Sequence, residues 1–295
     1  MRKIITVSLA LGLATALMAK PNIDNSEFKA NLSEIAGEKG LFAPHEKFPK
    51  DYFLINKNLP FSVGLTLHHP ESSTLELTKE QIGKIQEIKA ETMPTVIKSA
   101  QEIKALELAL SDKMVKGAKA SEMGAEVDKI ATLKAALTKA HLKCIESVRE
   151  VLTEKQRKVL LSYAGKKMKH GGGKHHKIAE LVPLPHPVKI VLQNEAELKI
   201  TKEQKEKIDK EMLAVFPEKI HGGMDKAEAI EDKIKKAVLT ETKTKEDLKT
   251  DIKALVDIKI QITNDHIDAL NHLSTILSKE QFSKVLELSK KKHKH

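Results

Sequence analysis

A five-residue motif occurs four times in this chain, and it constrains the fold more than any other feature. It begins with an aliphatic residue, followed by Thr or Ser, then two variable residues and finally Gln. The four copies read LTKEQ, LTEKQ, ITKEQ and LSKEQ. A hydroxyl residue followed three positions later by Gln is a capping box, in which the two side chains satisfy free backbone N–H groups of the first helical turn. We therefore expect a helix to begin at each motif. The fixed positions are Leu77, Thr78, Gln81, Leu152, Thr153, Gln156, Ile200, Thr201, Gln204, Leu277, Ser278 and Gln281.

The motifs are arranged as two copies of one longer pattern. LPFSVGLTL precedes the first motif of one copy, and LPHPVKIVL precedes that of the other. The two motifs of a copy lie 75 residues apart in the first copy and 77 in the second. Met93-Pro94 corresponds to Phe216-Pro217, and His141 to His266. Because the order of the motifs, their spacing and the positions of the prolines agree between the copies, we predict a tandem repeat.

The repeat divides the chain into segments. A Gly-, His- and Lys-rich linker without hydrophobic periodicity separates the copies, an irregular segment precedes the first copy, and a basic tail with His follows the second. The predicted boundaries are 20–57 for the irregular segment, 58–164 and 181–290 for the two repeats, 165–180 for the linker and 291–295 for the tail.

Each copy has the hydrophobic periodicity of helices. Apolar residues at three- and four-residue steps form a stripe from Val127 to Val151, and a matching stripe runs from Ile252 to Ile276. We expect Pro94 to end the first helix and a second helix to run from about Thr95 to Lys116. With aromatics at 3% and no Trp, the packing must rely on aliphatic residues. The predicted fold is all-α: two tandem four-helix units built on long antiparallel hairpins.

The first residues have the pattern of a secretory signal peptide. A short positive region, Met1-Arg2-Lys3, precedes an apolar stretch that ends at Ala19. Ala16 and Ala19 both fit a cleavage position, and we prefer cleavage after Ala19. An uncleaved membrane anchor is the alternative. We expect residues 1–19 to be removed and the rest to be a periplasmic protein without stable membrane insertion. Cys144 is the only cysteine, so no internal disulfide is expected.

Paired LTxxQ motifs behind a signal peptide, in a basic, aromatic-poor helical chain, resemble the Spy/CpxP family of periplasmic proteins. The resemblance covers Asn58 to Leu288 as two family units. It implies a cradle-shaped helical fold that is usually a dimer of long hairpins. In this chain the tandem units would form an equivalent pseudo-dimer, so we expect a monomer or weak dimer. Family members include ATP-independent chaperones and metal-binding relatives of the ZraP and CnrX types.

The first functional hypothesis is a periplasmic holdase that binds partly unfolded envelope proteins without ATP. A net charge of +10 and a surface mixing Lys with aliphatic residues would attract such clients. Methionines would add adaptable apolar surface, unless they fill core gaps. These are Met93, Met114, Met123, Met212 and Met224. A membrane sensor protein is a further candidate partner.

The second hypothesis is binding or sensing of zinc, copper or nickel, although no cofactor is required. His141 and Cys144 lie one helical turn apart, and His266 occupies the position equivalent to His141. The alternative is that both histidines are half-buried stripe residues and that Cys144 is a small apolar residue or an intermolecular link. Weak, exchangeable binding is expected at the linker and tail histidines: His170, His175, His176, His293 and His295.

Two other classes are disfavoured. Nucleic-acid binding rests on the basic charge alone, whereas export, interspersed acidic residues and few aromatics argue against it. The chain has no nucleophile–base pattern, metalloprotease helix motif or phosphate-binding loop, so we do not expect an enzyme. Most Glu and Asp residues are expected on solvated helix faces, paired with lysines three or four positions away.

Overall fold

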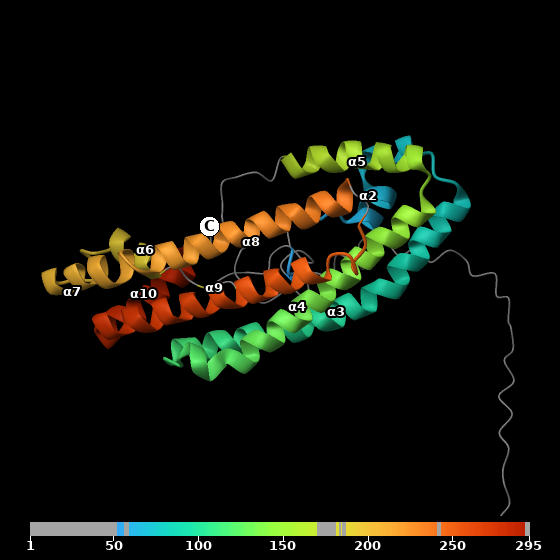
Figure 1. Ribbon diagram of the computed structural model, residues 1–295. Helices are drawn as coiled ribbons and strands as arrows, with labels where there is room; N and C mark the ends of the chain where they lie inside the picture. Colours follow the sequence, from blue (N-terminus) through green and yellow to red (C-terminus); the bar gives the residue numbers. More distant parts are fainter. Residues whose placement is uncertain are drawn as a thin grey trace, which may run out of the picture.

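The computed structural model describes residues 52–55, 59–169, 181–182, 184, 187–240 and 243–292. Over these residues the secondary structure is helical and contains no strand, which confirms the all-α prediction (Figure 1). None of the described helices is both long enough and apolar enough to cross a bilayer. The predicted signal peptide lies outside the described residues.

The first half of the chain is organised around one long helical hairpin. Its arms are α3 (Lys79–Val115) and α4 (Ala120–Val151), which pack against each other. Gly117, at φ 87°, takes the left-handed conformation in the turn between them, where glycine has no steric cost. Three shorter elements close the open end: α2 (Ser62–His68), the 3₁₀ helix η2 (Pro70–Leu75) and α5 (Glu154–Lys169).

The second half has a similar hairpin with one interrupted arm. That arm consists of α7 (Lys202–Lys207), a π-helical segment η3 (Ile208–Leu213) and α8 (Phe216–Leu239). The other arm is α9 (Lys249–Ile276), flanked by α6 (Pro187–Gln193) and α10 (Lys279–Lys292). Gly223 brings α8 close to α9, because a Cβ atom at this position would lie 2.7 Å from a side-chain carbon of Ile262.

The expectation that Pro94 ends a helix is wrong, because α3 continues through it. Pro94 is exposed, while Ile85, Ala100 and Ile103 on the opposite side of the helix are fully buried. Burial of this face along α4 outweighs the loss of one backbone hydrogen bond at proline. In the second half the corresponding Pro217 lies in the first turn of α8, where proline is tolerated.

The two hairpins pack through α4 and α9, which lie side by side (Figure 1). The turn of each hairpin forms a hydrogen bond with a long helix of the other hairpin. The Asn271 side chain of α9 donates to Ala118 O at 3.1 Å, and Glu146 of α4 accepts from the backbone N–H of Lys245. The start of each long helix therefore lies near the end of the other, so α4 and α9 are antiparallel.

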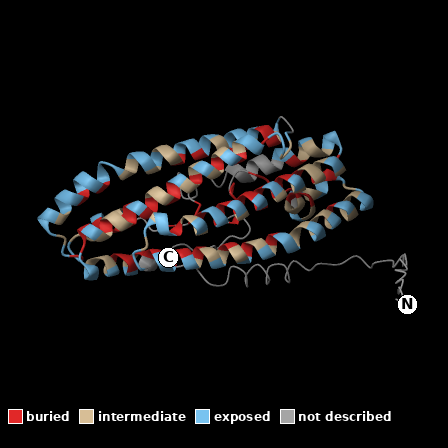
Figure 2. Cartoon of the chain, turned by 60° about the horizontal axis from the view of Figure 1, so that its bottom comes forward, coloured by how far each residue is buried: buried red, intermediate tan, exposed pale blue. Residues whose placement is uncertain are grey.

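The core lies between the hairpins, and the outer helix faces are exposed (Figure 2). It includes a short piece of the segment that we expected to be irregular: Tyr52, Phe53, Leu54 and Ile55 are at most 4% exposed. Leu181 and Val182, just before the second hairpin, are equally buried. These two pieces are called the first and second inner segments below.

Candidate functional site

The four repeated motifs all begin helices and form the capping box. Thr78 and Thr201 each accept a hydrogen bond from the backbone N–H of the Gln three positions later, and that Gln accepts from the cap residue's N–H. The same pair of bonds occurs between Thr153 and Gln156 and between Ser278 and Gln281.

The motif glutamines also bond to each other, which we did not predict. Gln81 Nε2 donates to Gln156 Oε1 at 2.8 Å, and Gln156 Nε2 donates back to Gln81 Oε1 at 3.0 Å. Gln204 and Gln281 form the same reciprocal pair in the second half. Each pair ties the starts of two helices together. Because only an amide can both accept and donate here, the pairing explains why the motif has Gln rather than Glu.

The glutamines satisfy helix ends as well. Gln81 Nε2 donates to the carbonyl of Val151, the last residue of α4, and Gln204 Nε2 to that of Ile276, the last residue of α9. These carbonyls have no partner within their own helix. The motif is therefore a structural device at the base of each hairpin.

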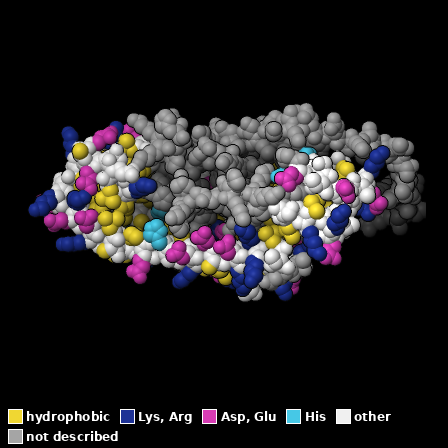
Figure 3. All heavy atoms as spheres, turned by 90° about the horizontal axis from the view of Figure 1, so that it is seen from above, with side chains coloured by type: hydrophobic (Ala, Val, Ile, Leu, Met, Phe, Trp, Pro, Cys, Tyr) yellow, Lys and Arg dark blue, Asp and Glu magenta, His cyan; other side chains and the backbone are white. Residues whose placement is uncertain are grey.

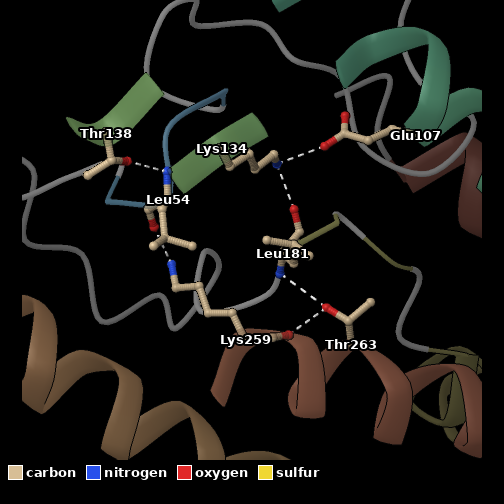
Figure 4. A network of polar contacts seen from close by, with 7 residues as sticks. All are labelled: Leu54, Glu107, Lys134, Thr138, Leu181, Lys259 and Thr263. Atoms are coloured by element: carbon tan, nitrogen blue, oxygen red, sulfur yellow. Dashed lines mark hydrogen bonds and ion pairs between the residues drawn. The ribbon is translucent and has the colours of Figure 1, made fainter. Parts of the chain in front are cut away.

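A second polar network lies in the centre of the molecule, between α4 and α9 (Figure 4). The first inner segment is held at Leu54. Its N–H donates to Thr138 Oγ1 on α4 at 2.8 Å, and its carbonyl accepts from Lys259 Nζ on α9 at 2.6 Å. We call Thr138 with Lys259 the first clamp.

The second inner segment is held in the same way, but here the Thr lies on α9 and the Lys on α4. Leu181 N–H donates to Thr263 Oγ1 on α9 at 3.2 Å, and Leu181 O accepts from Lys134 Nζ on α4 at 2.6 Å (Figure 4). We call Thr263 with Lys134 the second clamp. Thr263 and Lys259 lie 125 residues after Thr138 and Lys134, so the two clamps use corresponding positions.

Each clamp lysine is paired with a buried glutamate on the neighbouring arm of its own hairpin. Lys134 Nζ lies 2.7 Å from Glu107 Oε1 on α3, and Lys259 Nζ lies 2.6 Å from Glu231 Oε1 on α8. The four side chains are at most 9% exposed. Placing charges in the interior is costly unless they are paired, and here each lysine also donates to an inner-segment carbonyl.

The sequence contained a signal for this network. The lysines, at 134 and 259, lie within the apolar stripes of α4 and α9, four positions before Thr138 and Thr263 and seven before His141 and His266. A charged residue at an interior helical position, repeated in both copies, indicates a buried partner. We expected paired acids and lysines to be mostly solvated, and these two pairs are not.

His141 is buried among aromatic side chains. Its Nε2 lies 3.1 Å from Pro60 O, and its ring stacks on Phe61 and lies beside Phe53. Burial lowers the pKa of His141 to about 4, against a smaller opposing effect of the Pro60 hydrogen bond. The ring is therefore neutral at neutral pH, and Nε2–H donates to the carbonyl.

The other predicted metal ligands among the described residues, Cys144 and His266, do not complete a three-residue metal site with His141. Cys144 is a free, half-buried thiol whose pKa is raised by burial to about 11, so it is protonated at neutral pH. His266 is buried on α9. Across the described part of the chain, no group of three or more His, Cys, Asp or Glu side chains is placed to hold a metal ion. His170, His175, His176, His293 and His295 lie outside the described residues.

Exposed apolar side chains occur where the second hairpin is interrupted. Leu213 is 39% exposed and Val215 41%, and both flank Ala214 between η3 and α8. Leu192 of nearby α6 is 37% exposed. We call Leu192, Leu213 and Val215 the tip patch. Figure 3 shows hydrophobic side chains gathered at the end of the molecule that carries α6 and α7, among basic and acidic side chains.

Most of the methionines among the described residues do not contribute to such a surface. Met114, Met123, Met212 and Met224 are at most 6% exposed, and Met93 is half-buried. The stated alternative, that methionines fill core gaps, therefore holds for the four buried residues.

Comparisons with known proteins found no relative of this chain. No family model matches the chain, and neither a curated protein nor a solved structure matches it.

Proposed function

We propose that this protein is an exported, ATP-independent holdase that binds partly unfolded envelope proteins in the periplasm. The observation that carries the proposal is the tip patch, where Leu213 and Val215 project from an interrupted helix. Apolar surface gathered at one place on a folded protein is typical of an interaction site, and Figure 3 shows such surface at this end of the molecule. π-helical segments such as η3 are also frequent at functional sites.

The surroundings of the tip patch suit an unfolded client. Exposed lysines on the same elements, Lys207, Lys210 and Lys219, alternate with the acidic residues Asp209, Glu211 and Glu218. Mixed charge around an apolar centre allows many sequences to bind weakly, because no single charge pattern is required.

We further propose that the architecture is a tandem Spy/CpxP-like arrangement, in which 58–164 and 181–290 form an intrachain pseudo-dimer. The support comes from corresponding contacts: the paired motif glutamines, the two clamps, and the turn contacts of Asn271 and Glu146. The glutamine pair occurs once in each half, and the two clamps and the two turn contacts use corresponding residues of the two halves.

Aggregation of a denatured test protein, followed by light scattering without ATP, tests the holdase proposal. The chain purified after export and stripped of metal should suppress scattering at near-equimolar amounts. Leu213→Ser combined with Val215→Ser should remove most of this effect. Leu161→Ser on α5 is the matched control, since Leu161 is 40% exposed but lies in the other half. No suppression by the unaltered chain would refute the proposal, and equal loss in the control would refute the role of the tip patch.

Binding of zinc, copper or nickel stays a prediction. It now rests on the linker and tail histidines, which lie outside the described residues, and no contact in the described part favours it over the holdase.

A further inference from the structure

We propose that the two clamps are binding sites for short apolar polypeptide segments, and that the inner segments occupy them as internal substitutes for a client. The inference rests on the proposed holdase function, because it states how a client would be recognised. The tip patch would provide the first contact, and the clamps would hold a stretch of the client chain.

The clamps recognise main-chain atoms. Thr138 and Lys259 bond to the N–H and carbonyl of Leu54, and Thr263 and Lys134 bond to the N–H and carbonyl of Leu181. Every residue except proline offers the same two groups. The clamps therefore impose no side-chain identity, as when a peptide adds to a sheet edge and its main chain supplies the hydrogen bonds.

Two different sequences are already bound in this way. The first inner segment reads Tyr-Phe-Leu-Ile, and the second reads Leu-Val. Their shared property is burial of apolar side chains, since Leu54, Ile55, Leu181 and Val182 are at most 2% exposed. The ligand class follows directly: a short stretch of aliphatic or aromatic residues, which unfolded proteins expose and folded proteins bury.

The buried ion pairs fit a recognition role better than a stabilising one. Apolar residues of similar volume often replace a buried ion pair without loss of stability. Both halves nevertheless place a Lys–Glu pair beside an inner segment. Glu107 and Glu231 hold each ammonium group in place, so that it can donate to a carbonyl in a site shielded from water.

Exchange of an inner segment for a client segment would be close to balanced. An incoming apolar stretch would make the same two main-chain bonds and bury similar side chains, so it would replace the contacts that it displaces. The inner segment keeps the advantage of a tethered ligand, so a client must make further contacts, such as those at the tip patch, to displace it.

The test uses a fluorescein-labelled peptide of residues 50–57, Lys-Asp-Tyr-Phe-Leu-Ile-Asn-Lys, and fluorescence anisotropy. Phe53→Ser with Leu54→Ser should weaken the first inner segment and expose the first clamp. We expect this variant to bind the peptide at least tenfold more tightly than the unaltered chain. Adding Thr138→Val should reverse the gain at least tenfold, whereas adding Thr263→Val, at the second clamp, should leave most of it. Equal binding by the double serine variant and the unaltered chain, or equal effects of the two valine substitutions, would overturn the inference.

A measurement on the unaltered chain covers the case in which the double serine variant does not fold. Hydrogen–deuterium exchange at the Leu54 and Leu181 amides is followed with and without a denatured client. We expect at least one amide to exchange several-fold faster when client is bound, because its Thr acceptor is then taken by the client. Unchanged protection of both amides in a chain that does suppress aggregation would overturn the inference and leave the holdase function standing. Peptide binding at the exposed clamp without aggregation suppression would support the clamp and refute the holdase.

Discussion

Gln81 has two roles, one toward a residue close in the sequence and one toward residues far away in it. It accepts the N–H of Thr78 three residues away, and it donates to Val151 O and Gln156, which are 70 and 75 residues away. The first role is visible in the local motif. The second becomes visible only when the two arms of the hairpin are brought together.

Gln81→Glu separates these roles. Glutamate still accepts the cap N–H and suits the positive end of the helix dipole, but it cannot donate to Val151 O or Gln156. With net values of about 1 kcal/mol per hydrogen bond, and a carboxylate now facing a carbonyl oxygen, we expect a loss of about 2–3 kcal/mol in the free energy of unfolding. Urea denaturation followed by circular dichroism measures it. Thr78→Ser, which keeps the cap hydroxyl, is the control, and a Gln81→Glu protein as stable as this control would contradict the pairing argument.

His141 predicts a pH dependence of stability. Its pKa is lowered to about 4 in the folded protein and is near 6.5 when unfolded, so below pH 6.5 the unfolded chain binds the extra proton. The contribution of the neutral ring is fully present above pH 6.5 and is lost as the pH falls toward 4, up to about 3 kcal/mol.

Urea denaturation at pH 7.5 and at pH 5 tests this dependence. His141→Gln, which does not titrate in this range, should lose less stability between the two pH values than the unaltered chain. His221→Gln, at an exposed position on α8, is the control and should behave like the unaltered chain. The same pH sensitivity in His141→Gln and the unaltered chain would show that other groups cause it.

At the scale of the helix, replacing the two corresponding prolines should have different effects on stability. Pro94 lies inside α3 and costs a backbone hydrogen bond, whereas Pro217 lies in the first turn of α8, where no such bond is lost. Pro94→Ala should therefore stabilise the protein by up to about 3 kcal/mol, and Pro217→Ala should change it little. Thermal unfolding of both variants measures the difference. A larger gain at Pro217 would mean that the interruption at η3, and not the proline of α3, is the strained element.

A structural feature could be predicted from this sequence when it depends on residues close together along the chain. The helix starts at Thr78 and Thr201 and the stripes of α4 and α9 are local patterns, and the structure has them where the sequence places them. The continuation of α3 through Pro94 depends on burial against α4, which no local pattern contains. The clamps join Leu54 to Lys259 across 205 residues, so only the repeated lysine within an apolar stripe hinted at them.

At the scale of the whole molecule, the packing of α4 against α9 decides the expected oligomeric state. If the two halves pack as two copies of a dimer would, the surface that a second copy would use is already covered by the other hairpin. The clamps strengthen this argument, because Lys259 of the second hairpin and Thr138 of the first bind the same residue, Leu54. Separating the hairpins would leave Lys134, Lys259 and their glutamates without the inner-segment contacts.

We therefore expect a monomer or weak dimer in sedimentation equilibrium, with no change in secondary structure on dilution. Lys259→Met with Glu231→Leu removes one ion pair without leaving a single buried charge, and it should weaken the hold on the first inner segment while the chain stays monomeric. Lys134→Met with Glu107→Leu is the matched variant for the second inner segment. A tight dimer at micromolar concentration in the unaltered chain would mean that α4 and α9 do not complete the interface, and that the tip patch or another exposed surface joins two copies.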